Sequence, residues 1–151
     1  MVNNMEEELE FLDYLHNIIK LEKDAISRII KMRGKDDLLN KILKEQLEIY
    51  KKFDISTKKM IENRKKKTDE LSLFAKIASH LGTKVAISNA DDIDDTIDML
   101  IKRYQVCIEE IEAKQKESKI KSQTIKNISK RFVEFENKNI DIINKIPIDK
   151  V

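Results

Sequence analysis

The stretch that decides the fold class occupies residues 125–146 and reads IKNISKRFVEFENKNIDIINKI. Its apolar residues and one asparagine recur at alternating spacings of three and four: Ile125, Ile128, Phe132, Phe135, Asn139, Ile142 and Ile146. Such spacing places all of them on one side of an α-helix, as packing in a helical bundle requires. Pro147 follows and cannot continue a helix. We therefore predict a helix over about 119–146 whose apolar stripe faces a core.

The same spacing occurs three more times along the chain. It predicts long helices over about 5–33, 36–64 and 91–116, and a shorter amphipathic helix over 70–81. The first stripe is Leu12, Leu15, Ile19, Glu22, Ile26 and Ile29. The second is Leu39, Ile42, Gln46, Ile49, Phe53 and Met60. The third is Ile97, Leu100, Tyr104, Ile108 and Ile111. Gly34 is expected to end the first helix, since glycine readily adopts the left-handed conformation found there.

Composition agrees with a few long helices in one domain, residues 1–151. The chain has only two glycines and one proline, whereas β-proteins need many turn residues. Charged residues make up 38%, yet the net charge is only +2, so the charges are mixed rather than gathered for binding phosphates. A single cysteine and no apolar segment of signal-peptide or membrane-span type favour the cytoplasm and disfavour membrane insertion.

Several local strings resemble the ferritin-like superfamily, in particular a small uncharacterised bacterial branch. They are Leu21-Glu-Lys-Asp-Ala25, Phe74-Ala-Lys-Ile77 with Gly82-Thr-Lys84, Met99-Leu-Ile101 and Phe135-Glu-Asn-Lys-Asn-Ile140. The abundance of Ile, Lys and Asn also resembles an AT-rich bacterial genome. The resemblance implies a four-helix bundle of two up-down pairs joined by a long crossover, with the short helix 70–81 in that crossover.

The resemblance further implies where a di-iron or di-manganese centre would lie. Such a centre needs a glutamate from each of two helices and Glu-x-x-His from the other two. This chain has only two histidines, and neither completes the motif. The remaining candidate ligands are Glu22, Glu45 and Glu136, so we expect a bundle that has lost its metal centre and holds no cofactor.

Other residues of the expected interior have structural interpretations. Glu22 is expected to pair with a lysine at the bundle edge, because a buried carboxylate without a partner is costly. Tyr104 and Asn139 are expected to form a buried polar contact that fixes the helix register.

Three functions remain open at this point. The first is a non-enzymatic structural or protein-interaction module with an unknown protein partner. It includes self-association into a homo-oligomer through a second apolar face of the first helix: Phe11, Ile18, Ala25 and Met32. The second is a carboxylate-rich metal-binding oxidoreductase or a metal store. The third is an adaptor that binds nucleic acid or an anionic membrane through Lys58–Lys67, which the lack of interleaved aromatic residues disfavours.

Overall fold

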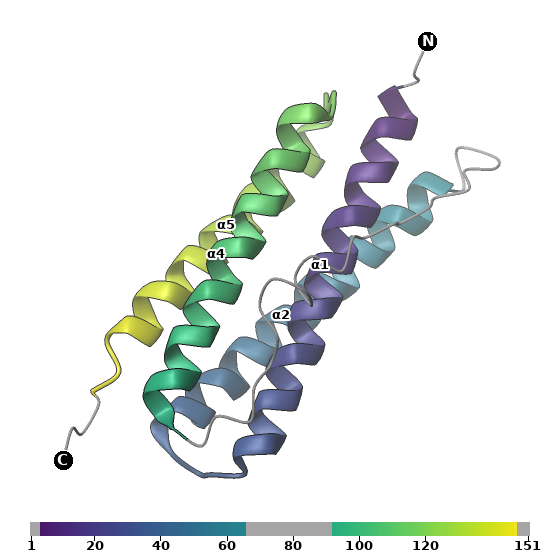
Figure 1. The fold of residues 1–151 in the computed structure, drawn as a ribbon. Coiled ribbons are helices and arrows are strands. Elements are labelled where there is room, and N and C mark those ends of the chain that lie inside the picture. The colour runs from purple at the N-terminus through teal and green to yellow at the C-terminus, as the bar shows by residue number, and fades with distance from the viewer. Residues whose placement is uncertain (1–3, 66–91, 148–151) are drawn as a thin grey trace.

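The computed structural model of the chain describes residues 4–65 and 92–147. Within these ranges it contains four α-helices and no strand: α1 (Asn4–Arg33), α2 (Leu38–Lys65), α4 (Ile93–Glu117) and α5 (Gln123–Asn144). The all-α class and the four-helix bundle predicted from the sequence are confirmed (Figure 1). The predicted short helix at 70–81 lies outside the described residues.

The helices form two antiparallel pairs that pack side by side (Figure 1). α1 pairs with α2, and α4 pairs with α5. α2 ends and α4 begins at opposite ends of the bundle, so these two helices run parallel (Figure 1). Each helix therefore has its middle turns near the centre of the bundle, where side chains from all four can meet.

The turn between α1 and α2 follows from its sequence. Gly34 has φ +56°, which allows its N–H to donate to the Ile30 carbonyl at 3.1 Å and ends the helix as predicted. Arg33 then donates two hydrogen bonds to the Asp37 carboxylate, at 2.9 and 2.7 Å. It donates a third to the Asn40 side-chain oxygen at 2.6 Å. The short loop is thus held by contacts within itself.

Glu8 joins three helices at the opposite end of the bundle. One oxygen of its carboxylate accepts the backbone N–H groups of Lys121 and Ser122, at 2.9 and 2.6 Å. The other oxygen accepts a hydrogen bond from Arg64 of α2 at 3.1 Å. A negative charge at a helix N-terminus is favourable, because unpaired N–H groups and the helix dipole point toward it. Glu8 of α1 therefore stabilises the start of α5 and attaches it to α2.

The start of α5 differs from the sequence prediction of about residue 119. Ser122 caps the helix, since its side chain accepts the Ile125 N–H at 3.3 Å. The residue has the extended backbone that a capping position needs, with φ −66° and ψ 117°. The helix therefore begins at Gln123.

The apolar stripe predicted for α1 is confirmed, because all of its members are buried: Leu12, Leu15, Ile19, Glu22, Ile26 and Ile29. On α2 and α5 the predicted stripe is wrong at one position each, Ile49 and Ile142. Ile49 is 39% exposed, while the next residue, Tyr50, is fully buried. Ile142 is 40% exposed, while Ile143 is fully buried. Both helices are thus rotated so that the next residue along the chain takes the inner place.

This rotation has a simple geometric cause. With 3.6 residues per turn, positions three and four residues further along lie on opposite sides of the same line down the helix. Where both carry apolar side chains, the sequence does not decide which one points inward. The rotation brings Glu136 into the core, where it is fully buried, and leaves Phe135 half-buried at the surface.

Candidate functional site

The centre of the bundle holds a group of polar side chains that we call the central polar cluster. All four helices contribute to it: Glu22 from α1, Gln46 and Tyr50 from α2, Arg103 and Tyr104 from α4, and Glu136 and Asn139 from α5. Each is at most 4% exposed. Buried polar groups in such a core need partners, and each of these side chains has at least one within the cluster. Among their atoms, Glu22 Oε2, Gln46 Nε2 and Glu136 Oε2 make no hydrogen bond with the described residues.

Glu22 forms an ion pair with Arg103 of α4. The nitrogen–oxygen distance is 2.7 Å, and the two side chains are 0% and 4% exposed. The sequence interpretation of Glu22 was therefore wrong in its partner and its place: the cation is an arginine in the core, not a lysine at the edge. An arginine is suited to this role because its guanidinium stays charged and is more weakly hydrated than an ammonium group.

Glu136 has a different kind of partner. The Tyr50 hydroxyl donates to one carboxyl oxygen at 2.5 Å, and the Asn139 amide donates to the Tyr50 oxygen at 3.4 Å. The other carboxyl oxygen of Glu136 is buried without a hydrogen-bond partner among the described side chains. Glu136 therefore has a neutral donor where Glu22 has a cation.

Tyr104 and Asn139 are both buried, but the direct contact expected between them is not the one observed. Tyr104 donates its hydroxyl to Gln46 at 2.5 Å, and Asn139 donates to Tyr50. Each of these bonds joins α2 to a helix of the other hairpin. The bonds therefore fix how the two hairpins sit against each other.

The two buried carboxyl groups have different electrostatic surroundings, although the pKa of both is raised. Burial raises the pKa of Glu136 well above its usual value, and the nearby charge of Glu22 raises it further. Burial also raises the pKa of Glu22, but the charge and hydrogen bond of Arg103 oppose that effect. Since only Glu22 directly contacts a cation, we assign the negative charge to Glu22 and a proton to Glu136. The cluster is then electrically balanced, which a low-dielectric core favours.

The three predicted metal ligands do not come together. Glu22 and Glu136 are fully buried, but Glu45 is exposed, and Gln46 takes the inner position beside it. Within residues 4–65 and 92–147, no three His, Cys, Asp or Glu side chains are placed to share a metal ion. A ferritin-like dinuclear centre does not fit these residues, because Arg103 already neutralises one of the two carboxylates.

Cys107 lies in the core on α4 and is fully buried, with 0% of its surface exposed. Burial raises the pKa of its thiol well above the usual value, and the negative charge of Glu22 acts in the same direction. A thiol is a nucleophile only as its thiolate. The environment of Cys107 therefore suits packing and disfavours nucleophilic chemistry.

His16 is the one histidine in the described part of the chain, and it lies between α1 and α2. Its Nδ1 atom is 2.7 Å from the Thr57 hydroxyl and 3.5 Å from an Asp54 oxygen. Burial lowers the pKa of His16. A catalytic triad needs the hydroxyl and the carboxylate on different ring nitrogens, whereas here both approach the same one. The group therefore joins two helices and has no relay geometry.

Sequence reasoning missed Arg103 and Tyr50 as members of the cluster. Both fit a spacing of three and four that was present in the sequence. Arg103 falls three residues after Leu100 and four before Cys107, and Tyr50 falls four residues after Gln46. An arginine beside Lys102 is usually solvated, because burial of a charge is costly, so the sequence alone does not indicate that Arg103 is buried.

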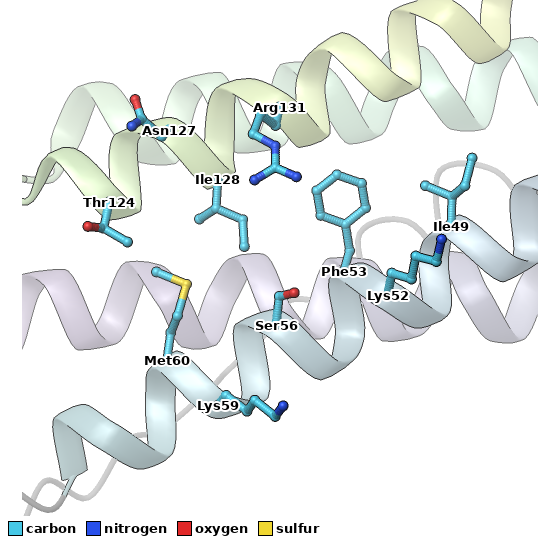
Figure 2. A pocket seen from close by; sticks show the side chains of 10 residues that line it. All are labelled: Ile49, Lys52, Phe53, Ser56, Lys59, Met60, Thr124, Asn127, Ile128 and Arg131. Atoms are coloured by element: carbon cyan, nitrogen blue, oxygen red, sulfur yellow. The ribbon is translucent and has the colours of Figure 1, made fainter.

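An open groove lies between α2 and α5, with a volume of about 540 Å³ (Figure 2). α2 contributes Ile49, Lys52, Phe53, Ser56, Lys59 and Met60. α5 contributes Thr124, Asn127, Ile128 and Arg131. A second hollow of about 430 Å³ shares Ile49, Phe53 and Arg131 and extends the groove to Phe135 and Lys138. Neither hollow is lined by a residue of the central polar cluster.

The floor of the groove rests on an aromatic group that joins α2 to α5. Phe53 packs against Phe132 with ring centres 5.1 Å apart and against Phe135 at 5.6 Å. Tyr50 packs against Phe135 at 5.0 Å from the inner side. Figure 2 shows Phe53 extending from α2 toward α5 and Arg131 extending from α5 into the groove. The floor is therefore apolar and held by rigid helices.

The surfaces proposed from the sequence for other functions are placed as follows. Phe11, Ile18 and Ala25 are buried within the chain, so they offer no face for self-association, and Met32 alone of that set is exposed. In the basic segment Lys58–Lys67, Lys58 and Lys59 are exposed, whereas residues 66 and 67 lie outside the described part. No described helix has the length and apolar character needed to cross a membrane.

Comparisons with protein-family models, curated protein sequences and solved structures gave no match. The ferritin-like relationship therefore stays a prediction from the sequence, and the functional argument rests on the geometry above.

Proposed function

We propose that this chain is a non-enzymatic helical bundle that acts as a structural or protein-interaction module. The observation that carries the proposal is a contrast between the interior and the surface. In the interior, the charged and polar groups bind one another and are closed to solvent. At the surface, an apolar groove is open and bordered by cations.

Within the described residues, the polar groups of the interior lie apart from the hollows at the surface. A reacting group must be within reach of a substrate, and a general acid or base must exchange protons with it. The polar residues at the bundle centre are at most 4% exposed, and neither hollow between α2 and α5 reaches them. Their hydrogen bonds instead join the two hairpins, which supports a structural role.

We further propose that the bundle is ferritin-like and has lost its metal centre. Two features support this origin: the parallel run of α2 and α4 between two antiparallel pairs, and the inward Glu22 and Glu136 (Figure 1). Glu136-x-x-Asn139 has an amide where Glu-x-x-His would place an imidazole. Arg103 supplies positive charge at the same centre, so the carboxylate of Glu22 has a partner without a metal.

Metal analysis tests this proposal. Protein purified without chelators is analysed by inductively coupled plasma mass spectrometry, before and after anaerobic loading with Fe(II) and Mn(II). We expect far less than one metal per chain, with the same result for Glu22→Gln and Glu136→Gln. A stoichiometric metal that is lost in either variant would overturn the proposal and establish the metal-binding alternative.

A further inference from the structure

α2 carries a second apolar seam beside the one that faces the core. Its members are Ile49, Phe53, Ser56 and Met60, spaced four, three and four residues apart. This is the spacing with which one helix packs along another in a coiled coil. Ile49 is 39% exposed, and Phe53 and Met60 are only half-buried. The bundle therefore leaves part of a helix-packing seam uncovered.

Cations lie beside this seam at a regular interval. Lys52 and Lys59 each precede a seam residue by one position and are seven residues apart, which is about 10 Å along a helix. In coiled coils these flanking positions meet oppositely charged residues of the partner helix. Arg131 and Lys138, on the opposite wall, are also seven residues apart.

All four cations are exposed, and none forms an ion pair with a described residue. Glu134 also borders the groove, but its ion-pair partner is Lys130 at 4.0 Å. The charge of the rim is therefore largely uncompensated within the described chain. It complements a partner that carries carboxylates on both flanks.

From these observations we infer that the groove between α2 and α5 binds an acidic amphipathic helix of a partner protein. The inference rests on the proposed role as an interaction module and specifies its partner. The seam from Ile49 to Met60 is about 16 Å long, which corresponds to about three turns of a bound helix. The bound helix presents apolar residues at i, i+3 or i+4 and i+7, with Asp or Glu on both sides.

The arrangement disfavours other occupants. A fatty acid has one charged end and would need a cation at one end of the groove, whereas these cations are repeated along both walls. A nucleic acid strand would place its phosphates near the rim but leave Ile49 and Met60 without apolar partners. A second copy packed through the same face would bring two sets of cations together, because a twofold contact is made by identical surfaces.

The probe is a phage-displayed library of 15-residue peptides on a helical template, selected against the immobilised full-length chain. Selected peptides are then synthesised with a fluorescent label, and their dissociation constants are measured by fluorescence anisotropy. The test variant is Lys52→Glu/Lys59→Glu. The matched control is Lys44→Glu/Lys51→Glu, which makes the same charge change at the same spacing on exposed residues of α2 outside the groove. Circular dichroism checks that both variants fold.

We expect the selected peptides to carry acidic residues beside an apolar helical seam. Their affinity should fall by at least about tenfold in the test variant and by less than about twofold in the control, because only the first reverses charges that face the peptide. Lysine in place of the acidic residues on the peptide flank that faces α2 should restore binding to the test variant.

The inference is overturned if the selected peptides lack the acidic helical pattern, or if the test variant and the control bind them equally. It is also overturned if no peptide is enriched, as would follow if another part of the chain or a second copy covers the groove. These failures are distinct from failure of the proposed function. A stoichiometric metal at Glu22 and Glu136 would disprove the non-enzymatic role without changing the peptide result.

Discussion

The ion pair between Glu22 and Arg103 gives the most informative single perturbation of this protein. We predict that Arg103→Met lowers the free energy of unfolding by about 3–5 kcal/mol at neutral pH, since it leaves the carboxylate of Glu22 buried without its cation. Globular proteins have only about 5–15 kcal/mol of stability in total. The variant should therefore still fold, but with little stability left.

The magnitude follows from the geometry of the pair. Charges at the observed 2.7 Å attract each other by about 6 kcal/mol at an effective dielectric constant of about 20. Desolvation of the two groups costs several kcal/mol for each ion, so the intact pair contributes little in net terms. We therefore expect the free energy of unfolding of Glu22→Leu/Arg103→Met to be within about 1 kcal/mol of the wild-type value or above it, because neither charge then remains buried.

Urea denaturation followed by circular dichroism measures the free energy of unfolding of the wild type, of Arg103→Met and of Glu22→Leu/Arg103→Met. Lys51→Met is the control, because it removes a cation from an exposed pair with Glu48 at 3.1 Å. Exposed pairs contribute about 0–1 kcal/mol, so this change should be small. The pH dependence adds a second readout for Arg103→Met.

Without its cation, Glu22 has a folded-state pKa above its unfolded value. Its protonated form then favours the folded state, so this contribution is present at low pH and lost as the pH rises through the folded-state pKa. The destabilisation of Arg103→Met relative to the wild type should therefore shrink on acidification toward about pH 4.5. A loss below about 1 kcal/mol at neutral pH, with no recovery in the double variant, would refute our account of the pair.

Three further predictions concern other buried groups. The pKa of Glu136 is raised in the folded state, so the wild type loses free energy of unfolding as the pH rises and Glu136 ionises. Glu136→Gln has no such group, so its stability relative to the wild type should increase between about pH 5 and 8 in urea unfolding. A difference that does not change with pH would contradict this. Glu8→Gln should lower the free energy of unfolding by about 1–2 kcal/mol, because it weakens the hydrogen bonds to the start of α5 and to Arg64. The control is Glu10→Gln at an exposed position, which should lower it by less than about 0.5 kcal/mol in the same measurement. The Cys107 thiol, fully buried, should react with Ellman's reagent only slowly in the native protein and rapidly in denaturant; fast native reaction would show that the core is open.

The four long helices and the buried face of α1 could be predicted from the sequence, because both follow from the spacing of apolar residues at three and four positions. Every member of the predicted α1 stripe is buried, and so are three residues of the second apolar face of this helix, Phe11, Ile18 and Ala25. Gly34 ended the helix for a local reason, its φ of +56°. Features that depend on three or four adjacent residues could thus be predicted from the sequence.

The candidate sites could be predicted only in part. Glu22 and Glu136 were identified as inward carboxylates, and both are fully buried. Their partners were not identified, because Arg103 and Tyr50 are 81 and 86 residues away from them in the chain. Glu45 was assigned inward by analogy with a family motif, while the packing placed Gln46 there and left Glu45 exposed.

By itself the sequence determined that this protein is an all-α bundle of long amphipathic helices, because apolar spacing and the scarcity of turn residues permit little else. Only the tertiary structure decided which of two adjacent positions faces inward on α2 and α5. The choice between Ile49 and Tyr50, or between Phe135 and Glu136, depends on contacts with the other hairpin. That one rotation places the carboxyl group of Glu136 in the core and leaves the apolar groove at the surface.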